Sequence, residues 1–90
     1  MGSDYTFSDK NATIKNSFIG VYGNQNVTFK NINFENINFR TNLYNKGYNR
    51  TMYFNNCIIK DSSIKDSGKL VKVYNNTKII KNGEYIDSLD

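Results

Sequence analysis

Residues 27–41, VTFKNINFENINFRT, repeat one five-residue unit three times. Each unit has an apolar residue, a small or polar residue, Phe, a charged residue and then Asn or Thr. This period fits neither an α-helix, whose faces recur about every 3.6 residues, nor a long straight strand, whose faces alternate every second residue. It constrains the fold strongly, because few backbone geometries return a side chain to the same face at every fifth position.

The same period extends over most of the chain when Phe29, Phe34 and Phe39 are taken as the centres of their units. Nine of the twelve centres are apolar or aromatic, compared with 38% of the whole chain: Ile14, Ile19, Asn24, Phe29, Phe34, Phe39, Tyr44, Asn49, Phe54, Ile59, Ile64 and Lys69. Charged residues follow the centre at Lys15, Lys30, Glu35, Arg40, Arg50, Lys60 and Lys65. Asn, Thr or Asp comes next at Asn16, Asn26, Asn31, Asn36, Thr41, Thr51, Asn56, Asp61 and Asp66. Three columns of different chemistry indicate a structural repeat.

A period of five is typical of a chain that runs straight for about three residues and then turns a corner. Within one unit, strand alternation places Ile32 and Phe34 on one face and Asn33 on the other. Glu35 and Asn36 then supply the corner, because Asn tolerates a left-handed backbone. Four such sides make a square coil of twenty residues, so residues 12–71 are predicted to form three coils.

The pattern resembles the pentapeptide-repeat family, which has Leu or Phe at the centre of each unit and a small residue two positions before it. The small-residue positions that match are Ala12, Ser17, Val27, Cys57, Ser62 and Ser67. The resemblance implies a right-handed square parallel β-helix. A looser parallel β-helix of the pectate-lyase type is the alternative, with strands at 12–19, 27–34 and 52–59 and loops at 20–26 and 42–51.

The two ends of a solenoid need caps, because they expose unpaired strand edges. We predict an N-terminal cap strand within 1–11, a β-solenoid over 12–69 and an antiparallel β-meander over 70–90, all in one domain. The meander would join LVKVY, TKIIK and EYIDS through the two-residue turns Asn75-Asn76 and Asn82-Gly83. Asn-Gly is a strong hairpin signal. The expected fold class is therefore all-β.

The amino-acid composition limits which catalytic and ligand-binding sites the chain can contain. The 90 residues include no His and one Cys, and their net charge is +4. They therefore lack the residue spacing of a zinc site, a Cys–His dyad or a Ser-His-Asp set, and no glycine-rich phosphate loop is present. We expect no enzymatic activity, no metal and no cofactor. The absence of a long apolar run or an N-terminal signal predicts a cytoplasmic chain without a membrane segment.

The charged column suggests a binding surface. Residues twenty apart would stack about 4.8 Å apart in a square coil, placing Lys30 against Arg50 and Arg40 against Lys60, while Glu35 neutralises Lys15. Stacked like charges are unfavourable unless an anion relieves them. The predicted partner-binding residues are Lys30, Arg40, Tyr44, Lys46, Tyr48, Arg50, Tyr53 and Lys60. The alternative is that these cations only keep the surface soluble and blunt the sheet edges.

The favoured function is a non-catalytic binding module that docks a rigid basic and aromatic face onto a macromolecule. An acidic protein surface or nucleic-acid phosphates would suit this face. Some pentapeptide-repeat proteins inhibit nucleic-acid enzymes by imitating DNA, but a DNA mimic should be acidic. If the chain is an inhibitor, we expect it to block an acidic or guide-bound site on a nucleic-acid-handling enzyme. A small single-domain chain with an AT-biased composition would suit a protein of the phage or mobile-element anti-defence type. The alternatives are a carbohydrate-binding β-helix and a structural or self-associating solenoid.

Overall fold

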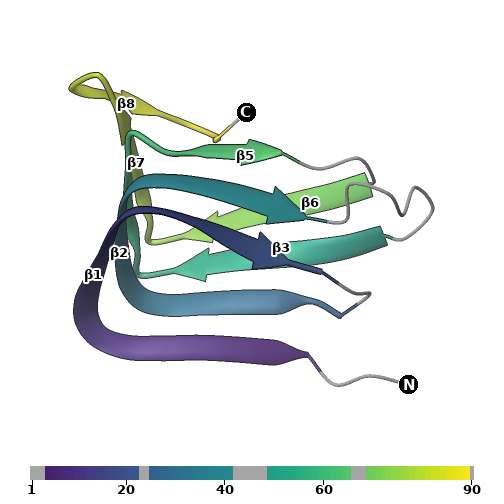
Figure 1. Ribbon diagram of the computed structural model, residues 1–90. Coiled ribbons are helices and arrows are strands. Elements are labelled where there is room, and N and C mark those ends of the chain that lie inside the picture. Colours follow the sequence, from purple (N-terminus) through teal and green to yellow (C-terminus); the bar gives the residue numbers. More distant parts are fainter. Residues whose placement is uncertain (1–3, 23–24, 42–48, 66–68, 90) are drawn as a thin grey trace.

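The computed structural model describes residues 4–22, 25–41, 49–65 and 69–89. These residues form one eight-stranded, curled sheet (Figure 1). The strands are β1 (Tyr5–Val21), β2 (Val27–Thr41), β3 (Asn49–Asn55), β4 (Ile58–Lys60), β5 (Ser63–Lys65), β6 (Lys69–Asn75), β7 (Lys78–Lys81) and β8 (Glu84–Ile86). All the pairings are parallel except that of β7 with β8. The predicted all-β class is confirmed.

The sheet curls because the chain turns two corners in each pass. In the first two passes a residue with positive φ stands at each corner: Asn11 and Asn16 in β1, and Asn31 and Asn36 in β2. Asn56, Asp61 and Asn76 continue the series further along the chain. Most of these residues are at the fifth position of the repeat unit, where the sequence predicts the corners. β1 and β2 therefore each run along three sides, as Figure 1 shows.

We call these sides walls and name them in chain order. The first wall contains residues 5–8 and 27–30 with β3 and β6; the second contains residues 12–15 and 32–35 with β4 and β7; the third contains residues 17–21 and 37–41 with β5. Successive passes stack as levels: β1, then β2, then β3 to β5, then β6 and β7. Paired residues are four repeat units apart between β1 and β2, from Ala12↔Ile32 onward. They are five units apart between β2 and the next level, from Val27↔Met52 onward.

The core lies inside the curl. Phe34, Phe39 and Phe54 are all at most 1% exposed, as the repeat predicts for its centres. The positions two before a centre also point inward, among them Val27, Ile32, Ile37, Met52 and Cys57. Along the first wall the aromatic rings of Phe7, Phe29, Phe54 and Tyr74 stack one above another, each 5.6 Å from the next.

The predicted C-terminal meander is only partly correct. The hairpin at Asn82-Gly83 is confirmed, with Lys81 paired to Glu84. β6, however, pairs in parallel with β3, and β7 pairs in parallel with β4, so the turn predicted at Asn75-Asn76 is a corner between two walls. The predicted N-terminal cap strand is also part of the stack, because residues 5–8 pair with 27–30.

Candidate interaction surfaces

The predicted binding residues do not gather on one face. Among the described residues, Lys30 is exposed on the first wall, Lys60 on the second and Arg40 on the third. Tyr53 is half-buried on the outside of the first wall, opposite Thr28. The remaining predicted residues, apart from Arg50, lie outside the described part of the chain: Tyr44, Lys46 and Tyr48.

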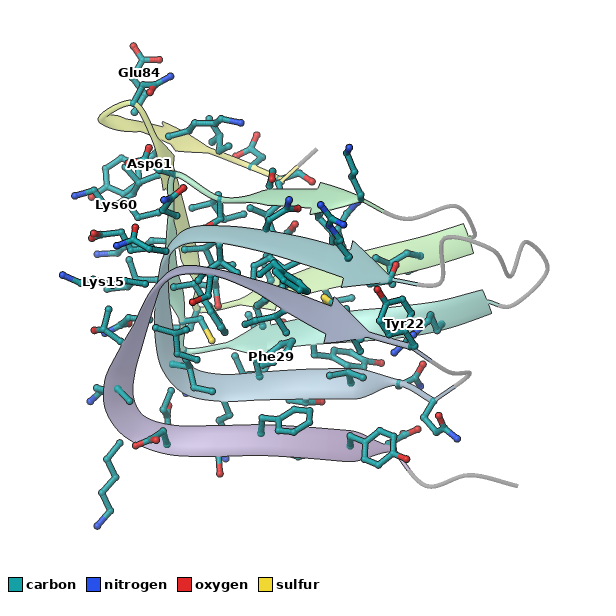
Figure 2. The ribbon with its side chains drawn as sticks, in the orientation of Figure 1. Lys15, Tyr22, Phe29, Lys60, Asp61 and Glu84 are labelled. Carbon is teal, nitrogen blue, oxygen red and sulfur yellow. The ribbon has the colours of Figure 1, made fainter. Side chains whose placement is uncertain are left out.

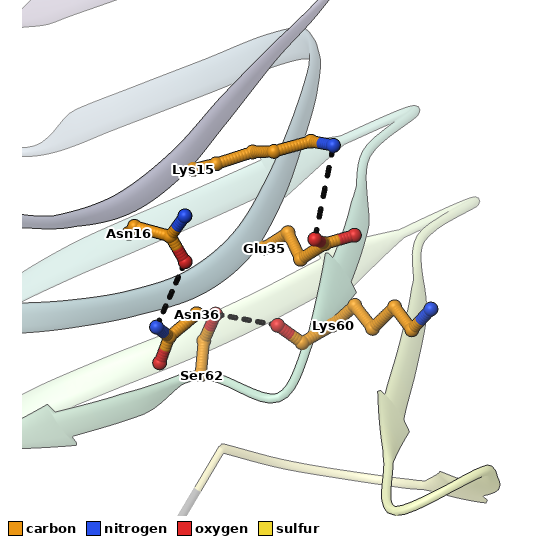
Figure 3. Close-up of polar contacts among 6 residues, drawn as sticks. All are labelled: Lys15, Asn16, Glu35, Asn36, Lys60 and Ser62. Atoms are coloured by element: carbon orange, nitrogen blue, oxygen red, sulfur yellow. Dashed lines mark hydrogen bonds and ion pairs between the residues drawn. The ribbon is translucent and has the colours of Figure 1, made fainter.

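The predicted pairs of stacked like charges, Lys30 with Arg50 and Arg40 with Lys60, are wrong. Because β2 and the next level are offset by five repeat units instead of four, Lys30 lies opposite Asn55 and Arg40 lies opposite Lys65. The predicted neutralisation of Lys15 is confirmed: its Nζ lies 3.9 Å from Oε2 of Glu35. Figure 3 shows this pair. Glu35 also pairs across the sheet with Lys60, so its position on the second wall lies between those of two lysines.

Arg50 is buried, in contrast to the prediction, and is only 4% exposed. The first wall of this level runs straight for seven residues in β3, and alternation turns Arg50 inward with Met52 and Phe54. Its Nη1 donates a hydrogen bond to the carbonyl oxygen of Val21, 3.2 Å away, at the end of β1. Burial lowers the pKa of the guanidinium from its ordinary value. Arg50 therefore links the first wall to the end of the third and is a structural residue.

The third wall carries a basic and aromatic cluster that the repeat pattern did not single out. We name Phe18, Arg40 and Lys65 the third-wall patch. Phe18 is 67% exposed, and the Arg40 guanidinium carbon lies 5.5 Å from the centre of its ring. Arg40 pairs across the sheet with Lys65, which is also exposed. Phe18 precedes a centre, so alternation alone would have placed this ring on the outer face.

A shallow depression of about 420 Å³ adjoins Phe18 on this wall. Its floor includes Asn38 and Ser63, which pair with each other across the sheet. Asp61 also lines it, and its carboxylate accepts a hydrogen bond of 2.9 Å from the backbone N–H of Asn82. The patch thus offers one exposed ring, two cations and a polar floor.

The β1 end of the stack is apolar and open. Tyr5, Phe7 and Ile14 point inward along β1, and they are 51%, 50% and 36% exposed. A cavity of about 520 Å³ opens among them and is also lined by Phe29 and Tyr22. Figure 2 places Phe29 inside the curl and Tyr22 beside the end of β1.

A glycine supports this arrangement at the β1 end. A Cβ atom at Gly20 would come within 2.7 Å of Cε2 of Tyr22, so the Tyr22 ring lies directly against the Gly20 backbone. A larger residue at position 20 would displace the ring from the mouth of the cavity.

The single thiol belongs to the core. Cys57 is 1% exposed, and its Sγ lies 3.4 Å from the carbonyl oxygen of Phe29, to which it can donate. Burial raises the pKa of the thiol, because the thiolate would be poorly solvated. Across the described ranges, no three His, Cys, Asp or Glu side chains are grouped as metal ligands.

Comparisons with known proteins do not assign this chain to a family. None of the protein-family models matches the chain, and a search of curated proteins finds no significant match. In the part of the chain that the structure describes, no helix has the length and apolar character needed to cross a membrane.

Proposed function

We propose that this chain is a non-catalytic binding module that docks the third-wall patch onto an acidic surface of another protein. The observation that carries the proposal is the exposed Phe18 ring, held on a strand with Arg40 over it and Lys65 alongside. Aromatic residues and Arg are the side chains that contribute most at protein interfaces.

Phe18 and Arg40 already contact each other before binding, which reduces the entropic cost of docking. Phe18 and Arg40 are on adjacent paired strands, and the cation–π contact restrains both side chains. Neighbouring like charges on a sheet are unfavourable, so Arg40 and Lys65 gain from an anionic partner that relieves their repulsion. An acidic surface with an apolar spot for Phe18 has the matching chemistry.

The distribution of charge favours a protein over nucleic acid as the partner. A nucleic-acid backbone needs a continuous basic track, with aromatic rings for successive bases. Here the exposed cations Lys30, Lys60 and Arg40 point away from three different walls. An acidic site on a nucleic-acid-handling enzyme is the narrower form of this proposal.

We further propose that the curled sheet is a short β-solenoid of the square type that the five-residue repeat predicts. From Ala12 onward, the parallel offset is four repeat units between β1 and β2 and five between β2 and the next level, which supports this architecture. The left-handed corners at five-residue spacing support it as well. In this architecture the third wall is a flat, fixed platform for docking.

The experiment compares two charge reversals of equal size. Arg40→Glu with Lys65→Glu alters the patch, while Lys30→Glu with Lys78→Glu alters exposed cations on the other walls. Each tagged chain is used for capture from a lysate of the source organism, with and without nuclease, and bound proteins are quantified by mass spectrometry. We expect the patch variant to capture at least tenfold less of a partner protein whose capture resists nuclease. The control variant should capture the unaltered amount, and the circular dichroism spectrum should be unchanged in both.

Equal retention by both variants would refute the third-wall patch as the docking surface. Capture that disappears with nuclease would mean that the partner is nucleic acid. Phe18→Ser provides a separate test of the aromatic contribution, and it should weaken capture without altering the net charge.

A further inference from the structure

We propose that two copies of this chain pair through their β1 ends to form a closed twofold dimer. This contact uses the edge and the exposed, inward-pointing side chains of β1, whereas the third-wall patch takes Phe18 from the outer face of the same strand.

The β1 end has the side chains of a core level but nothing stacked on its outer side within the described chain. The Phe7 ring stacks on Phe29 at 5.6 Å, continuing the aromatic column of the first wall, yet half of its surface is exposed. Ile14 stands above Phe34 in the same way on the second wall. Burying exposed apolar area of this kind is favourable, because it removes that area from water.

The opposite end of the stack has a filled interior, which argues against head-to-tail packing of side chains. β8 turns back along β7 as an antiparallel hairpin, pairing Ile80 with Tyr85. Leu89 then folds into the core at 3% exposure, and its backbone N–H donates to the Tyr74 hydroxyl at 3.1 Å. The outer edges of β5, β6 and β8 have no strand partner in the described part of the chain, but the exposed inward-pointing apolar side chains lie at the β1 end.

The course of β1 along three walls is compatible with a twofold axis that passes through Ile14 and runs perpendicular to the second wall. In the level beneath, Phe29 and Phe39 each lie five residues from Phe34, on the walls to either side. Their partners in β1 are Phe7 and Ile19. Rotation about Ile14 exchanges the first and third walls, so Phe7 of one copy meets Ile19 of the other.

The same rotation places Tyr5 opposite Val21 and Ile14 opposite itself, so that apolar side chains meet along all three walls. Such an isologous contact is self-complementary and stops at two subunits. The backbone edges of the second walls are then positioned to pair antiparallel.

The charges of β1 allow this contact. Asp4 and Asp9 balance Lys10 and Lys15, so the end is neutral although the chain carries +4. Two copies can therefore approach through β1 without the repulsion that their other surfaces would produce. The register shift between Ser8 and Ala12 interrupts the backbone edge at the first corner. We therefore assign the strand pairing to residues 12–15 and side-chain packing to the first and third walls.

The test measures the mass in solution by sedimentation equilibrium across a hundredfold range of protein concentration. We expect the unaltered chain to form a dimer and Ile14→Glu to be monomeric with an unchanged circular dichroism spectrum. Ile58→Glu is the matched control, because Ile58 is 43% exposed on the outside of the second wall. It should remain dimeric.

A second variant keeps the proposal testable if Ile14→Glu does not fold. In a Cys57→Ala background, Ile14→Cys should form a disulfide-linked dimer on mild oxidation, because the two sulfur atoms would face each other at the axis. Ile58→Cys should not. A monomeric unaltered chain at every concentration, a series of higher oligomers, or equal cross-linking of both cysteine variants would overturn the proposal.

Discussion

Asparagine is the residue that makes the corners of this molecule. Seven corner residues have positive φ, namely Asn11, Asn16, Asn31, Asn36, Asn56, Asp61 and Asn76. Other L-residues pay a steric cost there of roughly 1–2 kcal/mol, which the short polar side chain of Asn reduces. Some of these asparagines also bond to each other between levels: Nδ2 of Asn36 donates to Oδ1 of Asn16 at 2.9 Å, as Figure 3 shows.

Substitutions at Asn31 should isolate the backbone cost of a corner, because φ is 59° there and the Asn31 side-chain amide makes no hydrogen bond within the part of the chain that the structure describes. We expect Asn31→Ala to lower the free energy of unfolding by about 1 kcal/mol and Asn31→Gly to change it much less. Urea denaturation followed by circular dichroism measures both. Equal losses of unfolding free energy in the two variants would show that the Asn31 side chain, and not the left-handed backbone, determines the stability of the corner.

The buried thiol of Cys57 gives a prediction for reactivity and pH. Since burial raises its pKa, we expect a chromogenic disulfide reagent to label it at neutral pH only after denaturation. Because the folded state holds the thiol proton more tightly, this contribution to stability is fully present below the ordinary thiol pKa of about 8.5 and is lost as the pH rises through the raised value. Cys57→Ala should lack that part of the alkaline decline, and an identical decline in both chains would contradict the assignment.

At the scale of the elements, stability comes from columns of side chains that run across the levels. The second wall stacks Ile14, Phe34, Ile59 and Ile79, and the third stacks Ile19, Phe39 and Ile64. The rings of Phe34 and Phe39 meet edge to face at 5.1 Å, so the columns also contact one another inside the curl. A gap in one column therefore loosens the neighbouring wall.

Phe34→Ala should be severely destabilising, by about 3–5 kcal/mol, as truncations of buried Phe are. Phe18→Ala is the matched control, because Phe18 is exposed on β1, and we expect a change within about 0.5 kcal/mol. Thermal and urea unfolding of both variants measure the difference. A loss below about 1 kcal/mol for Phe34→Ala would contradict its place at a core centre.

At the scale of the whole molecule, the five-residue period predicted the inward columns and corner positions, because both depend on local backbone geometry. It failed where a wall is longer than one unit: β3 runs seven residues, and alternation then buries Arg50. The hairpin predicted at Asn75-Asn76, which was based on turn residues and not on the period, was also wrong. Only Asn76 there has positive φ, which gives a corner, whereas Asn82 and Gly83 both do, which gives a chain reversal.

The third-wall patch depends on which residues become neighbours in space, so the period alone could not select it. Arg40 meets Lys65 because these two levels are offset by five repeat units and not by the four expected of a square coil. The additional unit falls between β2 and β3, within the segment 42–51 that the looser β-helix alternative expects to be a loop. That alternative treats 27–34 and 52–59 as equivalent strands, which is the pairing found, whereas the strict square coil gives the wrong neighbours here.

Amide hydrogen exchange should report on the proposed dimer across the whole stack. We expect the amides of β2, between two paired levels, to exchange most slowly at any concentration. Amides of residues 12–15 in β1 should become better protected as the protein concentration rises, and Ile14→Glu should abolish that dependence. Concentration-independent exchange along β1 would contradict the pairing.

The two offsets, one of four repeat units and one of five, have a consequence for how such a molecule can change. Each level contacts only the levels directly beside it, so a tandem duplication of four units could lengthen the stack without a new core. The sequence between Thr41 and Asn49 carries the additional unit, and β2 still pairs with β3, β4 and β5 on the three walls. The sequence between these two residues is therefore the place where a foreign peptide could be inserted.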